Sequence, residues 1–91
     1  MTTMVTSARA EALFTSALAT GSDPSHDAVD EAIRLALRAR GGTRGCAADV
    51  AAEYGDHPDL AVPRMRWALG MIDQLYAGRR ARRRHGWALV A

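Results

Sequence analysis

The sequence DPSHDAVDEAIRLALRARGG, residues 23–42, contains the start and stop signals of one helix and decides the fold class. Ser25, or Asp23 followed by proline in the first helical position, is a good N-cap because its side chain accepts a hydrogen bond from a free amide of the first turn. Gly41 and Gly42 end the helix, since glycine adopts the left-handed conformation that closes a helix end. Apolar residues recur between these signals at helical spacing: Val29, Ala32, Ile33, Ala36 and Leu37.

Shorter helices are predicted on both sides of this one. The first begins at a cap, Thr6 or Ser7, and ends at about Ala19, before a run of turn-forming residues. The third begins after Thr43, and Gly55 is its predicted left-handed end. The buried stripe predicted for the third helix consists of Cys46, Ala47, Val50, Ala51 and Tyr54.

The fourth predicted helix lies between residues 59 and 77 and contains Pro63, which lacks an amide hydrogen. We expect one turn at 59–62 and a long helix from Pro63 onward, with a kinked continuous helix as the alternative. At about 100° per residue, one set of side chains faces the core: Ala61, Met65, Ala68, Ile72, Leu75 and Tyr76. A second apolar set lies on another side: Leu60, Trp67 and Met71. A helix with two apolar faces is either central in its bundle or contacts a partner.

The composition also favours an all-α fold. Hydrophobic residues make up 48 % of the chain, which is within the globular range, and many of them are alanines that favour helices. No stretch alternates apolar and polar residues with period two, so a sheet is not expected. We predict a compact bundle of about four helices in one domain, residues 1–78, followed by a flexible arginine-rich tail, residues 79–91.

The positive charge is concentrated in this tail. Residues 1–78 carry seven arginines against ten acidic residues, a net charge of −3 with neutral histidines. The tail contains the other five arginines: Arg79, Arg80, Arg82, Arg83 and Arg84. Arginine clusters neutralise nucleic-acid phosphates, so these residues are candidate nucleic-acid contacts, with an acidic protein patch or an anionic surface as alternatives.

Residues with reactive or metal-binding side chains are few and lie far apart in the sequence. Cys46 is the single cysteine, so it forms no internal disulfide, and its place on an apolar stripe predicts burial. His26, His57 and His85 form no pair at chelating spacing with one another or with Cys46. We therefore expect no metal site, no cofactor and no small-molecule substrate. Because no nucleophile lies beside a recognisable base, we also expect a protein that is not an enzyme.

Neither a membrane span nor a secretory signal is expected. No apolar run approaches the roughly 20 residues of a membrane-spanning helix, and the first twenty residues lack a basic start followed by an apolar run. The expected location is cytoplasmic, without a membrane partner.

The stretch VAAEYGDHPDLAVPRMRW, residues 50–67, resembles the helix-turn-helix core of bacterial repressors. Ala51 matches the small residue in the first helix, Gly55 the glycine of the turn, and Pro58 the start of the second helix. The resemblance implies that a helix from Pro58 or Pro63 enters the major groove with Arg64 and Arg66 near base edges.

This stretch also departs from the helix-turn-helix pattern. Asp56 follows the glycine where the pattern has an apolar residue, Pro63 lies where the second helix is continuous, and Arg64 takes a position that usually faces inward. Residues 56–76 carry two arginines against three aspartates, whereas a groove-binding helix needs positive potential. An ordinary helical hairpin is therefore the other interpretation.

Residues 45–67 also resemble small uncharacterised helical proteins of actinomycete bacteria. The Gly-Asp-His-Pro turn at 55–58 and the Arg-Met-Arg-Trp sequence at 64–67 carry the resemblance. It implies a bacterial origin and a helical fold, and it supplies no activity.

Two binding functions follow from these patterns. The leading hypothesis is a regulatory or adaptor protein that binds a protein partner, or a second copy as a homodimer, through Leu60, Trp67 and Met71. Trp67 lies either in this interface, where tryptophan is enriched, or in the core beneath the first helix. The alternative is an atypical helix-turn-helix regulator that binds DNA through Arg64, Arg66 and the tail arginines.

Overall fold

The computed structural model describes residues 3–77, which form four α-helices and a final π-helical turn without any strand. The helices are α1 (Met4–Phe14), α2 (His26–Arg40), α3 (Thr43–Asp56) and α4 (Pro58–Ile72), and the π-helical turn η1 spans Asp73–Ala77. The predicted all-α bundle is confirmed, whereas the tail predicted at 79–91 lies outside the described residues. No helix in this part of the chain has both the length and the apolar character that a membrane crossing needs.

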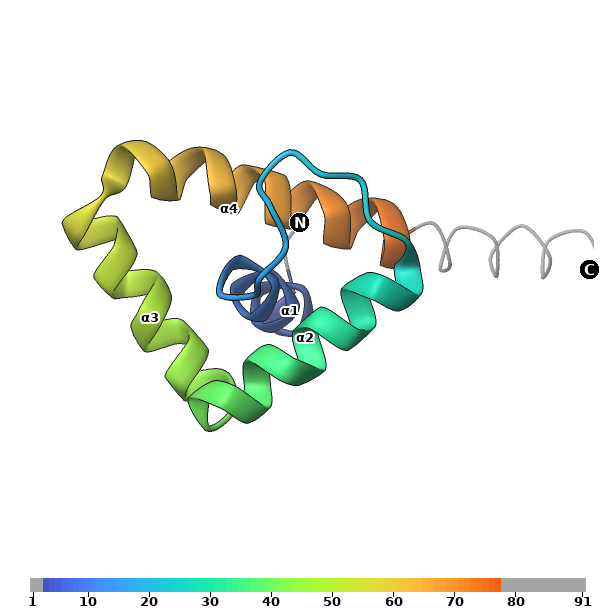
Figure 1. Ribbon diagram of the computed structural model, residues 1–91, viewed down its shortest axis with the longest axis horizontal. Coiled ribbons are helices and arrows are strands. Elements are labelled where there is room, and N and C mark those ends of the chain that lie inside the picture. The colour runs from blue at the N-terminus through green and yellow to red at the C-terminus, as the bar shows by residue number, and fades with distance from the viewer. Residues whose placement is uncertain (1–2, 78–91) are drawn as a thin grey trace, which may run out of the picture.

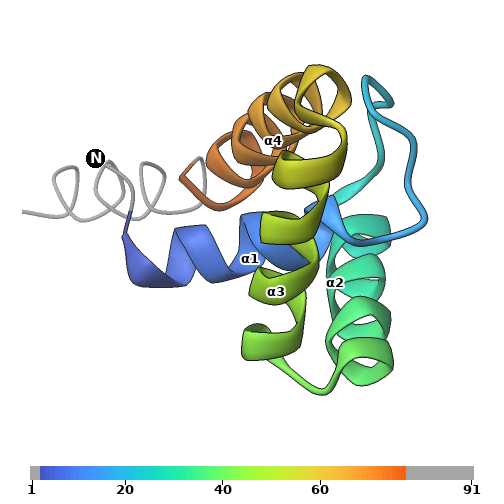
Figure 2. The ribbon, with the colours of Figure 1, turned by 90° about the vertical axis from the view of Figure 1, so that its left-hand side faces the viewer.

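The first helix, α1, lies at the centre of the bundle. Figure 1 looks along α1 and shows α2, α3 and α4 as three sides of a triangle around it. Figure 2 shows the same arrangement from the side, with α2 and α3 next to each other. The buried core takes side chains from all four helices: Ala10, Ala12, Leu13, Phe14, Val29, Ile33, Ala36, Cys46, Val50, Ala61, Ala68, Met71 and Ile72. Each outer helix therefore buries one apolar face against α1.

Both ends of α1 differ from the prediction. Its N-cap is Thr3, whose hydroxyl accepts a hydrogen bond from an amide of the first turn, so the helix begins before the predicted cap. It ends at Phe14 and not at Ala19. The hydroxyls of Thr15 and Ser16 donate to main-chain carbonyls three residues earlier, at 2.9 and 2.6 Å. Such bonds compete with the helical ladder and favour a helix end at this point.

Both predicted ends of α2 are confirmed. The Ser25 hydroxyl accepts a hydrogen bond from the Ala28 amide at 3.1 Å. Gly41 closes the helix with a left-handed φ of 76°, and the Gly42 amide donates to the Leu37 carbonyl at 2.8 Å. The predicted apolar stripe faces the core, with Val29, Ile33 and Ala36 buried and Ala32 and Leu37 half-buried.

Loss of the Ser25 cap should cost a measurable part of the stability. We expect Ser25→Ala to lower the free energy of unfolding by about 1 kcal/mol, because one amide of the first turn loses its acceptor. For a domain of this size the midpoint of thermal unfolding, followed by circular dichroism, should fall by about 4–8 °C. Ser25→Asp retains an acceptor and should unfold near the wild-type temperature. Equal midpoints for Ser25→Ala and the wild type would contradict this role.

The corner between α3 and α4 is made by a proline and not by the predicted glycine. Gly55 lies inside α3 without a left-handed φ. The chain turns at His57, with φ −141° and ψ 65°, because the residue before a proline is disfavoured in the helical conformation. Pro58 then opens α4, which continues through Pro63. The predicted break at Pro63 is therefore wrong, and the continuity of the alternative is confirmed, with one main-chain hydrogen bond fewer in the helix.

The predicted core faces of α3 and α4 have different outcomes. In α4 and η1 the predicted face of the fourth helix is confirmed, with Ala61, Ala68 and Ile72 buried and Met65, Leu75 and Tyr76 half-buried. In α3, Cys46 and Val50 are buried and Ala47 is half-buried, but Ala51 and Tyr54 are exposed. The end of α3 belongs to a corner that projects from the bundle (Figure 1), and every residue from 51 to 60 is exposed.

Candidate protein-binding groove

An open groove lies between α2 and the segment 15–18 that follows α1. Its volume is about 590 Å³, and it is lined by Thr15, Ser16, Ala17, Leu18, Ala28, Glu31, Ala32, Leu35, Ala36, Ala39 and Arg40. Leu35 is 52 % exposed although α2 packs its opposite side against the core. The helix therefore has a second apolar face that no part of residues 3–77 covers.

The lining of the groove suits apolar side chains. Five of the lining residues are alanines, and Leu18 and Leu35 add larger apolar surface. Glu31 and Arg40 are the charged lining residues, and each is already in an ion pair, Glu31 with Arg34 and Arg40 with Asp49. No histidine or cysteine occurs among the described residues of the lining. A shallow apolar groove beside a helix is the type of surface that accepts an amphipathic helix.

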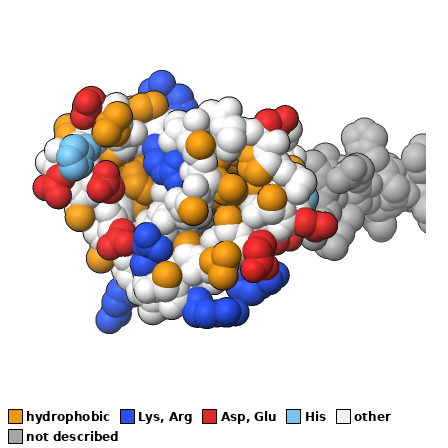
Figure 3. All heavy atoms as spheres, in the orientation of Figure 1, with side chains coloured by type: hydrophobic (Ala, Val, Ile, Leu, Met, Phe, Trp, Pro, Cys, Tyr) orange, Lys and Arg blue, Asp and Glu red, His pale blue; other side chains and the backbone are white. Residues whose placement is uncertain are grey.

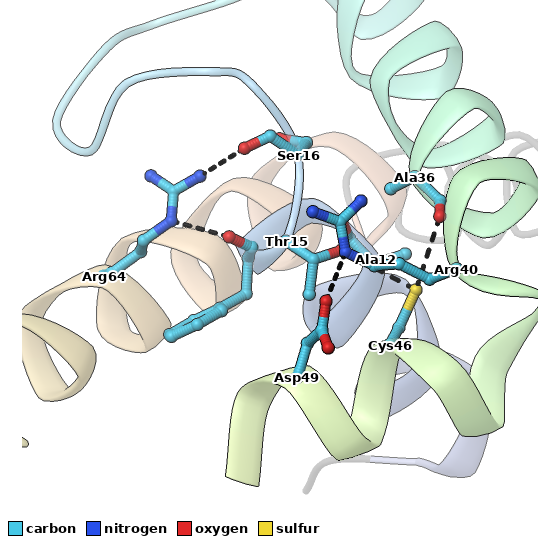
Figure 4. A network of polar contacts seen from close by, with 9 residues as sticks. Ala12, Thr15, Ser16, Ala36, Arg40, Cys46, Asp49 and Arg64 are labelled. Atoms are coloured by element: carbon cyan, nitrogen blue, oxygen red, sulfur yellow. Dashed lines mark hydrogen bonds and ion pairs between the residues drawn. The ribbon is translucent and has the colours of Figure 1, made fainter. Parts of the chain in front are cut away.

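The segment 15–18 separates this groove from a second, more polar hollow. The second hollow has a volume of about 570 Å³ and includes Arg40, Asp49, Glu53 and Arg64 in its lining. The Arg40 Nε lies 2.6 Å from an Asp49 carboxylate oxygen, which joins the end of α2 to α3 (Figure 4). The segment is thus a wall shared by an apolar groove and a more polar hollow.

Arg64 holds this wall in place from α4. Its guanidinium donates three hydrogen bonds: Nε to the Phe14 carbonyl at 2.6 Å, Nη2 to the Ser16 carbonyl at 2.9 Å, and Nη1 to the Thr20 hydroxyl at 2.8 Å. Figure 4 shows the side chain reaching from α4 toward the segment after α1. It also lies 5.1 Å from the centre of the Trp67 ring system. A cation at the carbonyl end of α1 satisfies acceptors that the helix leaves open and suits its dipole.

These bonds give Arg64 a role within the bundle, and its predicted contact with a DNA groove stays a prediction. Three of its five N–H groups donate within the bundle, and partial burial lowers the pKa of its guanidinium through desolvation. Arg66, the second residue of that prediction, is exposed on α4. The predicted tail contacts lie outside the described residues: Arg79, Arg80, Arg82, Arg83 and Arg84.

Leu60, Trp67 and Met71 do not form the shared exposed face that was predicted. Leu60 is 62 % exposed at the α3–α4 corner, whereas Met71 is buried in the core. Trp67 is half-buried, and its indole Nε1 donates to the Ser22 carbonyl at 2.8 Å. The loop between α1 and α2 covers Trp67, which has a role inside the bundle, so only Leu60 of the three is well exposed.

A polar cluster joins the start of α2 to η1. His26 Nδ1 lies 3.1 Å from an Asp30 carboxylate oxygen, and the Tyr76 hydroxyl donates to the other oxygen of Asp30. Asp27 also lies close, and one ligand atom each from the three α2 residues falls within 4.8 Å of the others. The Arg9 guanidinium, 4.0 Å from the Tyr76 ring centre, adds positive charge next to this helix start. The cluster thus joins α1, α2 and η1.

Sequence reasoning missed both the groove and this cluster. Leu35 falls off the core stripe of α2, and that position is the signal that could have indicated a second apolar face. His26 and Asp30 are four residues apart, which places them together on a helix, but the partner Tyr76 is distant in sequence.

Comparison of the chain with known proteins gave no relative. No protein-family model matches it, and the searches of curated proteins and of solved structures found no significant match.

Proposed function

We propose that this chain is a small non-enzymatic adaptor or regulatory protein that binds a helical segment of a protein in the groove beside α2. The observation that carries the proposal is the uncovered apolar face of α2, with Leu35 half in solvent beside a groove of about 590 Å³. Exposed apolar surface of this kind promotes aggregation unless a partner covers it.

The positions of the charges favour a protein over a nucleic acid as the partner. Residues 3–77 contain seven arginines and ten acidic residues, so this part of the chain repels a polyanion. Arg64, one of the two basic residues of α4, uses three of its five N–H groups within the bundle. The groove itself offers apolar contacts and little free charge.

This function is tested by selecting helical peptides that bind to the protein. A displayed library of helical peptides should yield binders with apolar residues at the spacing of one helix face. We expect Leu35→Arg to raise the dissociation constants of the selected peptides by about tenfold or more, because the substitution places a charge in the groove. Binding is measured by fluorescence anisotropy.

Leu60→Arg is the matched control, since Leu60 is also an exposed leucine but lies at the α3–α4 corner. It makes the same change of charge and should leave peptide binding unchanged. Failure to select any peptide, or an equal loss of affinity in Leu60→Arg, would remove the support for this groove.

A further inference from the structure

We infer that the occupant of the groove is α2 of a second copy of this chain, packed antiparallel to the first across a two-fold axis. This inference rests on the proposed binding function of the groove and specifies its partner. It is argued from the order of apolar and charged residues on the outer side of α2.

The apolar part of this surface is a narrow stripe. We define the outer stripe as Ala28, Ala32, Leu35 and Ala39, which all line the groove. At about 100° per residue these four positions fall within a narrow arc of the helix. The small side chains allow close approach of another helix, and the single leucine can insert beside an alanine of the other copy.

Charged residues occupy one side of the outer stripe in a definite order. We define the charged flank as Asp27, Glu31, Arg34 and Arg38, which are all exposed. Glu31 and Arg34 form an ion pair on the surface of one chain, and both side chains stay more than half exposed, so the charges of a second copy can share this pair. The two acidic residues come first along the helix and the two arginines follow. Figure 3 shows acidic and basic groups close together along the side that α2 forms.

An antiparallel second copy matches this order. The two-fold axis places the charged flank of one helix against the charged flank of the other, with reversed direction. Asp27 and Glu31 then face the arginines of the other copy, whereas a parallel copy would place the two charged flanks on opposite sides of the contact, where they cannot pair. Along the helix, the centre of the four outer-stripe positions and the centre of the four charged-flank positions both lie next to Ile33. One axis therefore satisfies the apolar and the charged contacts together.

The helix dipole explains only part of this pattern. Acidic residues near the start of a helix and basic residues near its end are favourable in any helix. The dipole does not require that they share one side of the helix or that an exposed leucine lies beside them. Surface ion pairs contribute little to affinity, so their main effect here is to select the antiparallel orientation.

Charge reversal tests the inference on the full chain. Sedimentation equilibrium should show a dimer for the wild type, and two double variants should be monomeric: Asp27→Arg with Glu31→Arg, and Arg34→Glu with Arg38→Glu. Mixed in equal amounts, the two variants should form a heterodimer, because each then presents the complement of the other flank. Circular dichroism verifies that both remain helical.

Leu35→Arg should raise the dissociation constant of the dimer by about tenfold or more, and Leu60→Arg should leave it unchanged. A wild-type chain that stays monomeric at every concentration, or a mixture of the double variants that does not associate, would overturn the inference. If selected peptides still bind a monomeric wild type, the proposed function holds and the partner is a different protein. If neither association is found, both proposals fail.

Discussion

Replacing Arg64 with alanine is expected to lower the free energy of unfolding by about 2–4 kcal/mol. The substitution removes three hydrogen bonds from a charged donor and leaves the Phe14 and Ser16 carbonyls without this partner. It also removes the contact of the guanidinium with the Trp67 ring. The midpoint of thermal unfolding should fall by about 10–20 °C for a domain of this size.

Two further variants separate this role from a general effect of charge. Arg64→Lys keeps the charge but cannot reproduce three divergent hydrogen bonds, so we expect it to restore little of the stability. Arg66→Ala removes an exposed arginine from the same helix and should change the free energy of unfolding by less than about 0.5 kcal/mol. Equal stability of Arg64→Ala and Arg66→Ala would show that the three bonds are not important for the fold.

The same residue connects the fold to the candidate groove. The segment 15–18 is one wall of the groove, and Arg64 binds carbonyls at residues 14 and 16. Without these bonds, amide hydrogen exchange should become faster in this segment, since its backbone would be held by fewer contacts. The stability of the bundle and the shape of the proposed binding surface thus depend on one side chain.

The sequence was sufficient to predict the helices whose signals are local. The Ser25 cap, the glycines after α2 and the periodic core face of α4 all depend on residues within a few positions of one another. The end of α1 could not be predicted in this way, because the hydroxyls of Thr15 and Ser16 and the distant Arg64 act together at that point. The sequence predicts the end of α3 at Gly55, whereas the rigid ring of Pro58 ends the helix by disfavouring the helical conformation at the residue before it.

The candidate site was predicted less well because its parts come from different elements. Leu60, Trp67 and Met71 share a side of α4 in a helical projection, but the projection cannot show that the core and the loop after α1 cover two of them. Alanines at 28, 32 and 39 fit a core, a surface or a groove equally well. Only the position of the segment 15–18 beside α2 distinguishes these alternatives.

Gly45→Ala is the second substitution for which we expect a large loss of stability. An added Cβ at Gly45 would overlap the carbonyl oxygen of Arg40 and lie 2.7 Å from its carbonyl carbon. The carbonyl belongs to the backbone at the end of α2, so it cannot move without shifting the connection through Gly41 and Gly42. A shift of this connection would disturb the end of α2, where Gly41 has a left-handed φ of 76° and the Gly42 amide donates to the Leu37 carbonyl at 2.8 Å.

We therefore expect Gly45→Ala to lower the free energy of unfolding by at least about 2 kcal/mol, measured by urea denaturation. Gly55→Ala is the matched control in the same helix, because a Cβ there meets no atom within 4 Å. Alanine has the higher helix propensity, so this control should be neutral or more stable than the wild type by up to about 1 kcal/mol. If both variants were equally stable, the close approach of α3 to the Arg40 carbonyl would be contradicted. A loss confined to Gly45→Ala would instead show that glycine is needed there because α2 and α3 meet too closely for a side chain.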